Sequence, residues 1–298
     1  QMHEMDAYRA SVYVDDPMLM ARGTELQNER AHVKTVVAWA ALGFKLAFNK
    51  AAHGKKDKPV TWTSAVYHLG DSLIQVMVKQ AIVDDVAEDI TAFLKENVIP
   101  IKRMRTLCGR LVCIASLLYI WRPFVDMLWA PLYDEEARGD APPGCLWTSQ
   151  VKIPLIWMKA FLIKESAMKR EFYIADYMGE GKKVRITADA SPWCLGAYLE
   201  EDGCITEYII SAISQEDTAR FNHKIGDAAG QQTWEALILL VALRAWSPKW
   251  QNRRVQLAVR SDSISALTAL LKFKNVGEGS ARIAREMALD IAGAVYKP

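Results

Sequence analysis

The chain has 298 residues, of which 51% are apolar, and its 37 Lys and Arg against 35 Asp and Glu give a formal net charge of +2. This length is enough for about two domains, each with its own core, and the balanced charge excludes a chain-wide basic signature for nucleic acid. The five cysteines are odd in number and form no C-x-x-C pair, which argues against a secreted disulfide framework. We therefore expect reduced, mostly buried thiols and an intracellular, reducing compartment: the cytoplasm and nucleus, or an organelle matrix such as that of the mitochondrion.

No targeting or membrane-spanning segment is apparent. The most apolar run, residues 111–121, is bracketed by arginines and is too short to cross a bilayer, so it predicts a core helix and no membrane association. Because the chain starts with Gln1 and not with Met, we expect the true amino terminus to lie upstream.

The first elements are two short apolar strands in A-S-V-Y-V-D-D-P-M-L-M-A, with Asp15 and Asp16 where they meet. This pattern predicts a hairpin with both acids at its tip, although an Asp-Asp pair there can be simple turn chemistry. Helical spacing follows over residues 24–43. The stretch L-G-F-K-L-A-F-N-K then predicts a return to a strand, and V-T-W-T and V-Y-H-L-G predict two more.

This succession resembles the second half of a reverse transcriptase palm. Y-V-D-D at residues 13–16 looks like the catalytic hairpin of that family, and H-L-G at 68–70 looks like its primer-grip strand. The resemblance implies that Asp15 binds metal and that Asp16 assists, because nucleotide transfer uses two metal ions about 4 Å apart. Pro17 departs from the pattern, since an imino ring follows the acid pair directly.

Residues 83–97 and 100–133 predict two helices. The second has an apolar stripe that we assign to the core: Leu107, Leu111, Ile114, Leu118 and Trp121. I-K-R-M-R-T-L-C-G-R-L and W-A-P-L-Y resemble the thumb helices of retroelement reverse transcriptases. Phosphate contacts are then expected from the opposite face and from an earlier basic cluster, namely from Lys102, Arg103, Arg105, Lys55 and Lys56. The simpler interpretation is a solvated helix face and a solvated loop.

The charged, Pro- and Gly-rich stretch D-E-E-A-R-G-D-A-P-P-G at 134–144 predicts a linker. A helix-like connection over 146–162 follows. Next come three acids on three separate elements: Asp189 at the end of an alternating strand, Glu235 in an apolar helix stopped by Pro248, and Asp262 between a strand and a helix. Such a set suits a divalent cation like Mg²⁺, which prefers carboxylate oxygens. Taken singly, each acid has a simpler explanation as a turn residue, a wet helix edge or an N-cap.

The order of T-A-D-A-S, G-A-Y-L, W-E-A-L and R-S-D-S resembles the ribonuclease H domain of retrotransposon polyproteins. On that resemblance Asp189, Glu235 and Asp262 match the first three metal-binding acids of a site that holds two Mg²⁺ ions. Asp290, in a helix expected over 280–295, is not assigned to metal, because the fourth acid of the family lies further on.

The predicted fold class is therefore α/β (α+β). We expect a partial palm in residues 1–70, a helical thumb in 71–133, a linker and connection in 134–183, and a ribonuclease H-like mixed sheet with helices in 184–298, incomplete at its end. The resemblance implies binding of RNA or an RNA:DNA hybrid, with Mg²⁺-dependent hydrolysis of the RNA strand. Polymerase activity is not expected from this chain alone, because the upstream acid that completes the polymerase site is missing.

A second class of function stays open. The chain could be a catalytically silent, domesticated RNA-binding or scaffold subunit of a ribonucleoprotein such as an organellar ribosome. Truncated sheet edges would then expose apolar surface that protein or RNA of a larger complex covers. Accidental resemblance in an unrelated mixed α/β protein is the third interpretation.

Overall fold

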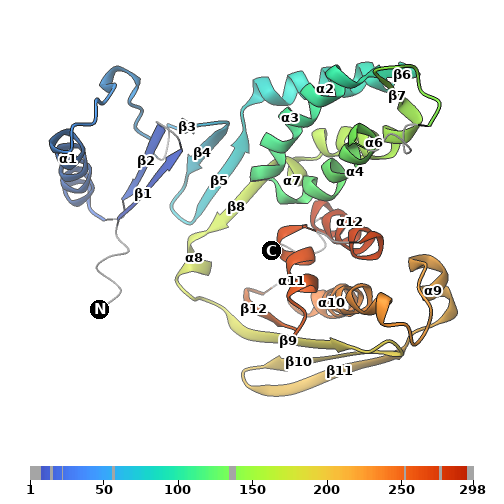
Figure 1. Cartoon of the computed structure of the whole chain (residues 1–298). Coiled ribbons are helices and arrows are strands. Elements are labelled where there is room, and N and C mark those ends of the chain that lie inside the picture. Colours follow the sequence, from blue (N-terminus) through green and yellow to red (C-terminus); the bar gives the residue numbers. More distant parts are fainter. Residues whose placement is uncertain are drawn as a thin grey trace. The chain divides into compact units, whose positions relative to one another are not determined.

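The computed structural model describes residues 8–13, 16–21, 23–55, 58–133, 139–251, 253–274 and 277–293. It is a mixed α/β protein with several small sheets, which confirms the predicted class at that level (Figure 1). The chain divides into two compact units, Gln1–Gly70 and Asp71–Pro298.

The first unit begins with the expected hairpin. Strands β1 (Tyr8–Tyr13) and β2 (Asp16–Ala21) pair antiparallel, with Tyr13 opposite Asp16. Helix α1 (Glu25–Ala41) starts at a capping box, in which the Thr24 hydroxyl accepts from the Gln27 amide and the Gln27 side chain accepts from the Thr24 amide. No residue of α1 is buried.

The strand predicted over residues 42–50 is wrong. Gly43 adopts a φ of +84° just after α1, and the segment then runs into the short 3₁₀ helix η2 (Phe48–Lys50). The turn at Gly43 redirects the chain, and in the described part of this unit no strand pairs with the segment. The two short strands expected afterwards are confirmed as the antiparallel pair β3 (Val60–Trp62) and β4 (Ala65–Leu69).

The second unit opens with a helical part. Its helices are α2 (Gln80–Phe93), α3 (Ile101–Leu117), α4 (Arg122–Tyr133) and α6 (Thr148–Leu162). Shorter elements connect them: β5 (Leu73–Val78) with β8 (Lys169–Tyr173), β6 (Val98–Pro100) with β7 (Cys145–Trp147), η3 (Tyr119–Trp121), α7 (Glu165–Met168) and α8 (Ile174–Tyr177).

The single helix predicted over 100–133 is wrong, because it breaks at Leu118, where ψ is 85°. The cause lies in Pro123, whose ring would clash with the carbonyl of Tyr119 four residues earlier in a continuous helix. The stripe assigned to the core is buried as predicted in all five residues. No helix in the described ranges is long and apolar enough to cross a membrane.

The rest of the second unit is a four-stranded sheet with helices. Strands β9 (Lys182–Ala190), β10 (Cys194–Glu201) and β11 (Cys204–Ala212) run antiparallel, and β12 (Val255–Arg260) lies parallel to β9, in the order β11-β10-β9-β12. The helices are α9 (Gln215–Phe221), α10 (Gln231–Trp246), α11 (Ile264–Lys272) and α12 (Glu278–Ala292), with 3₁₀ turns η4 (Ala228–Gly230) and η5 (Ser247–Lys249). These elements confirm the strands and helices predicted for residues 184–293.

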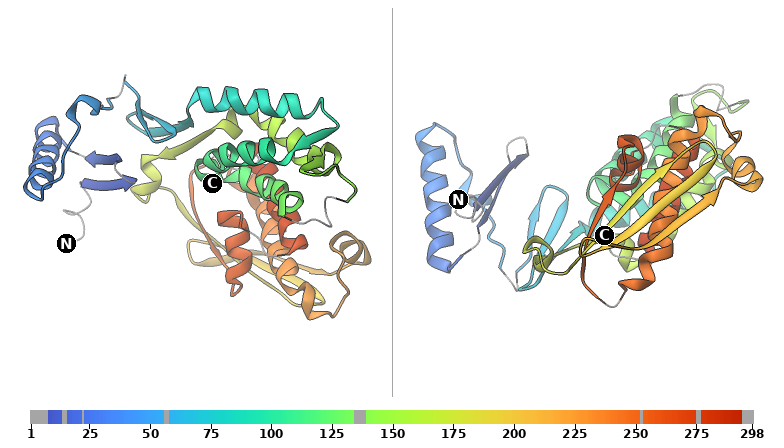
Figure 2. Two further views of the ribbon diagram at one scale, coloured as in Figure 1. Left: turned by 45° about the horizontal axis from the view of Figure 1, so that its top comes forward. Right: turned by 90° about the horizontal axis from the view of Figure 1, so that it is seen from below.

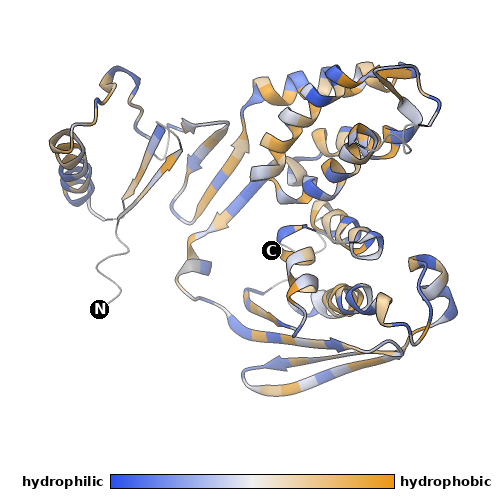
Figure 3. Ribbon diagram, viewed as in Figure 1, coloured by the Kyte–Doolittle hydropathy of each residue, from blue (hydrophilic) through white to orange (hydrophobic). Residues whose placement is uncertain are grey.

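Helix α10 is the centre of this arrangement. It packs on β9 and β10, while α11 and α12 pack against α10 (Figure 2). A helix contacted on several sides should be apolar around most of its surface, and the fully buried Trp234, Ile238 and Leu239 of α10 fit that expectation. Apolar and polar residues alternate along β9 (Figure 3), and buried residues alternate with more exposed ones along β9 and β10, so one face of these strands meets α10.

The helical and sheet parts of the second unit share a single apolar core. Helix α12 contacts α4, α7 and η3 as well as α10. Hydrogen bonds also join the parts: Ser166 Oγ donates to the Ala292 carbonyl at 2.7 Å, and Arg122 Nη1 donates to the Lys272 carbonyl at 2.9 Å.

The five cysteines are free thiols. The expectation that they are mostly buried is wrong, because only Cys108, on the core side of α3, is fully buried. Cys204 is exposed, since it begins β11 at the edge of the sheet.

Candidate functional site

Asp189 lies near the end of β9. Val184, Ile186 and Ala188 are buried on the face covered by α10, whereas Asp189 alternates with them and is exposed. The period of two along a strand places Arg185 on the same side as Asp189. The sequence-based placement of Asp189 at a strand end, facing away from the core, is therefore confirmed.

Asp262 follows β12, the strand parallel to β9. The register pairs Arg260 with Thr187, so the same register continued two residues further would bring Asp262 opposite Asp189. Neighbouring strands lie about 4.8 Å apart, and the ends of such a pair are close. Asp262 is not the N-cap of α11, because Ser263 fills that role by accepting from the Ala266 amide at 3.2 Å.

Glu235 lies in the second turn of α10 and is partly buried. Its Oε1 accepts a hydrogen bond from the side-chain amide of Gln231 at 2.9 Å. The same amide nitrogen donates to the carbonyl of Ala190. Gln231 thus ties Glu235 to the backbone of the residue next to Asp189, and all three acids are associated with one end of the β9–β12 pair.

This end of the sheet suits a hard cation in its chemistry but not in its present geometry. The three acids offer carboxylate oxygens, which Mg²⁺ prefers, and Gln231 Oε1 is buried without a hydrogen-bond partner. However, among the described residues no three His, Cys, Asp or Glu side chains are gathered so that they could hold a metal ion. The side chains would have to move before they could share an ion.

The polymerase-like pair is described only in part. Asp15 lies outside the described residues, so its expected role stays a prediction. Asp16 is exposed at the start of β2, and its backbone carbonyl accepts from Trp62 Nε1 at 3.0 Å. Pro17 does not end the hairpin, because it pairs with Val12 in the register.

The basic residues expected to meet phosphate differ in their surroundings. Lys102 and Arg105 are exposed on α3, away from the buried stripe. Arg103 is held by both carboxylate oxygens of Glu96 at 2.9 Å and lies over the ring of Phe93. Its charge is therefore already matched.

The other cluster, in the first unit, is described less fully. Lys55 pairs with the exposed Glu25 at 3.8 Å, and Lys56 lies outside the described residues.

One partner of the three acids, Gln231, was not predicted from the sequence. Gln231 could have been found, since it lies four residues before Glu235 and faces the same side of a helix. Asp290 instead forms a two-pronged ion pair with Arg244, at 2.7 and 2.9 Å, which links α10 to α12. The hydrogen bonds from Arg244 to Asp290 and then to Glu286 outweigh partial burial and raise the pKa of the guanidinium. Asp290 is thus engaged in a structural contact.

No protein-family model and no curated protein matches the sequence. Solved structures of a foamy viral protease-reverse transcriptase are similar to the chain. The dRH form with double-stranded DNA has a TM-score of 0.39 at 14% identity, covering 94% of this chain and 44% of that one. The complex with an RNA/DNA hybrid has 0.38 at 12%, covering 93% and 34%, and a second double-stranded DNA complex has 0.39 at 14%, covering 96% and 53%. The chain spans about half or less of the length of these structures.

Proposed function

We propose that this chain is a reverse transcriptase and ribonuclease H-like segment that binds RNA or an RNA:DNA hybrid through its second unit. The observation that supports this best is the placement of Asp189 near the end of β9 and of Asp262 just after the adjacent parallel strand β12, with Glu235 tied to the same end by Gln231. In open sheets of α/β proteins, ligands bind outside the carboxyl ends of parallel strands, where loops leave a crevice.

The finer proposal is Mg²⁺-dependent hydrolysis of the RNA strand. Bound Mg²⁺ would supply a Lewis acid and an activated water. The side chains that would hold it are Asp189, Glu235 and Asp262. The role of Gln231 is to orient the Glu235 carboxylate by donating to Oε1, which leaves the other carboxylate oxygen available.

Phosphate contact is proposed for the exposed face of α3. Lys102 and Arg105 form no ion pair with any described residue, so their charges are available to a nucleic-acid backbone. Each phosphate neutralised makes binding more sensitive to salt, because condensed counterions are released.

Binding is tested by fluorescence anisotropy over a range of salt concentrations. Since the similar foamy viral structures are complexes with double-stranded DNA and with an RNA/DNA hybrid, these two serve as probes. Lys102→Ala combined with Arg105→Ala should weaken binding and lower the salt slope by about 2. Lys159→Ala combined with Lys164→Ala removes the same charge from exposed positions elsewhere on the second unit. This control should change neither the affinity nor the salt slope. Equal effects of both pairs would contradict the proposed face.

Hydrolysis is tested on the hybrid with and without Mg²⁺. Asp189→Asn and Asp262→Asn should each abolish cleavage of the RNA strand. Asp202→Asn is the matched control, because Asp202 lies in the β10–β11 turn, at the opposite end of the strands, with a φ of +52° that asparagine tolerates. Cleavage that persists in both site variants would refute the assignment of the acids.

The alternative proposal is a silent RNA-binding or scaffold subunit. Two observations favour it. Tyr208 and Ile210 on β11 are 74% and 72% exposed on the outer face of the sheet, and among the described residues no three acidic, histidine or cysteine side chains lie close enough together to hold a metal ion. Hybrid or RNA binding without any Mg²⁺-dependent cleavage would support this alternative over the enzyme.

A further inference from the structure

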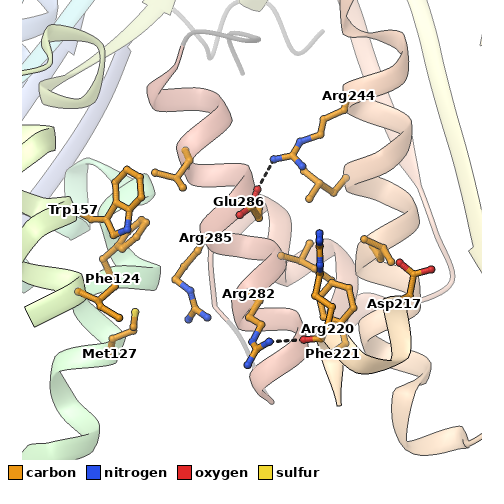
Figure 4. Close-up of a pocket in the computed structure, with 15 residues that line it drawn as sticks. Phe124, Met127, Trp157, Asp217, Arg220, Phe221, Arg244, Arg282, Arg285 and Glu286 are labelled. Atoms are coloured by element: carbon orange, nitrogen blue, oxygen red, sulfur yellow. Dashed lines mark hydrogen bonds and ion pairs between the residues drawn. The ribbon is translucent and has the colours of Figure 1, made fainter. Parts of the chain in front are cut away.

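A cleft of about 480 Å³ lies within the second unit, and Asp189, Glu235 and Asp262 are not among the residues that line it. Helices α4 and α6 supply one wall, and α9, α10 and α12 supply the other (Figure 4). Sites for small ligands commonly have volumes of about 300–1,000 Å³ and combine apolar walls with a few polar groups. The size of this cleft is therefore that of a small-molecule site.

Guanidinium groups are concentrated on the second wall. Arg282 and Arg285 lie three residues apart on α12, and Arg220 lies nearby in the last turn of α9. Arg282 donates to the Arg220 carbonyl and pairs with Glu278. By contrast, neither Arg285 nor Arg220 forms a hydrogen bond or an ion pair with any side chain in the described ranges.

Arg285 is a cation held in an unfavourable setting. Its side chain is partly buried, and burial followed by repulsion from Arg282 lowers the pKa of its guanidinium. Burying a charge without a partner costs free energy, which an anion beside it would recover. An anionic group is thus the natural complement of this wall.

The acidic side chains in the cleft do not fill that role. Glu286 accepts from Arg244 at 2.8 Å, and Asp217 accepts from the amide and hydroxyl of Ser214 at 2.9 and 2.7 Å. Both carboxylates are engaged by neighbours other than Arg285 and Arg220. Among the residues that line the cleft, the four arginines outnumber the two acids, Asp217 and Glu286, so the lining itself has a positive charge.

The first wall is aromatic and apolar. Trp157, Phe124 and Met127 project toward the cleft and face the arginine wall (Figure 4). The Trp157 side chain is 40% exposed, although its ring contacts Phe124 with centroids 6.2 Å apart. An exposed indole beside a cleft offers a face on which a flat ring can stack.

We propose that this cleft binds a nucleotide, with the phosphate between Arg285 and Arg220 and the base against Trp157. The guanidinium fork matches phosphate oxygens in geometry as well as charge. An acidic peptide would also satisfy the arginines, but it would leave the indole face without a flat partner. The nucleotide can be free in solution or can be an unpaired residue of a nucleic-acid strand.

Calorimetric titration of the full chain with adenosine 5′-monophosphate, adenosine and inorganic phosphate tests the proposal. The monophosphate should bind more tightly than either part. Arg285→Met and Arg220→Met should each weaken it by about tenfold or more, and Trp157→Ala should weaken it while leaving phosphate binding unchanged. Arg30→Met removes one exposed guanidinium from α1 and should change nothing. Circular dichroism establishes whether each variant is folded. If Arg285→Met does not fold, Arg220→Met, at the surface of α9, provides the test instead.

A short 5′-phosphorylated single strand is titrated in parallel. Binding of the monophosphate identifies a free nucleotide as a ligand, and binding of the strand alone, lost in Arg285→Met, identifies an unpaired residue of a strand. Three results would each overturn the proposal. The first is that neither the monophosphate nor the strand binds, and the second is that binding is unchanged in both arginine variants. The third is that inorganic phosphate binds as tightly as the monophosphate. Asp189→Asn should leave nucleotide binding intact, so this test and the hydrolysis test can fail independently.

Discussion

Replacing Gly279 with alanine should destabilise the chain, although alanine normally favours a helix. Gly279 lies in the first turn of α12, where that helix crosses the buried Thr233 of α10. A Cβ atom on Gly279 would lie 2.6 Å from Thr233 Cγ2, 3.0 Å from its Cβ and closer still to its Oγ1. Contacts this short cannot persist, so either the Thr233 side chain or the two helices would have to shift.

The expected magnitude follows from opposing effects. Alanine in place of glycine gains about 1 kcal/mol or less in a helix, while overpacking costs about 1–3 kcal/mol. Moving Thr233 also endangers its 3.1 Å hydrogen bond with His223 Nε2, worth about 1 kcal/mol. We expect a net loss of about 1–3 kcal/mol in the free energy of unfolding, or about 2–4 °C in Tm for each kcal/mol.

Urea unfolding followed by circular dichroism measures this loss. Gly109→Ala is the matched control, because Gly109 lies inside α3 with nothing within 4 Å of an added Cβ. The control should gain up to about 1 kcal/mol. In a Thr233→Ala background, which removes two of the three contacts, Gly279→Ala should cost less. A rise in stability for Gly279→Ala equal to that of the control would refute the close crossing of α10 and α12.

Three further predictions concern charges and thiols. Arg244→Met should cost about 1–2 kcal/mol in urea unfolding, because it removes the two hydrogen bonds that the 13% exposed Asp290 accepts from the guanidinium, while the 41% exposure of Arg244 screens the pair. With a thiol reagent, Cys204 should react rapidly and Cys108 slowly, since burial raises the pKa of the Cys108 thiol to about 12, and Cys204→Ser should remove the fast phase. The hydrogen bonds that Lys169 donates to Glu165 and Glu171 raise the pKa of its ammonium group, so the stabilisation from this group is complete below about pH 10.4 and is lost as the pH rises through the folded pKa. The stability difference between wild type and Lys169→Met should shrink there, and a difference that grew with pH would contradict the ion pair.

Local patterns in the sequence determined much of the second unit. The alternation around Val184 and Ile186 defined β9 and the exposed side on which Asp189 lies, and the apolar run before Pro248 defined α10. These signals are local because side-chain direction follows the period of a strand or a helix. The break before Pro123 was also written in the sequence, but the apolar stripe on both sides of it obscured it.

Only the tertiary structure decided which distant segments meet. Strands as short as β6 and β7 exist because residues 98–100 and 145–147 pair across the helices between them, and neither has a periodic signal of its own. The proximity of the ends of β9 and β12, which carry Asp189 and Asp262, depends on the register of these strands, and the link from Glu235 to Ala190 depends on how α10 lies on the sheet. The arginine cleft likewise joins α4 and α6 to α9 and α12, more than fifty residues apart in the chain. Such contacts are set by the packing of whole elements, which a local pattern cannot encode.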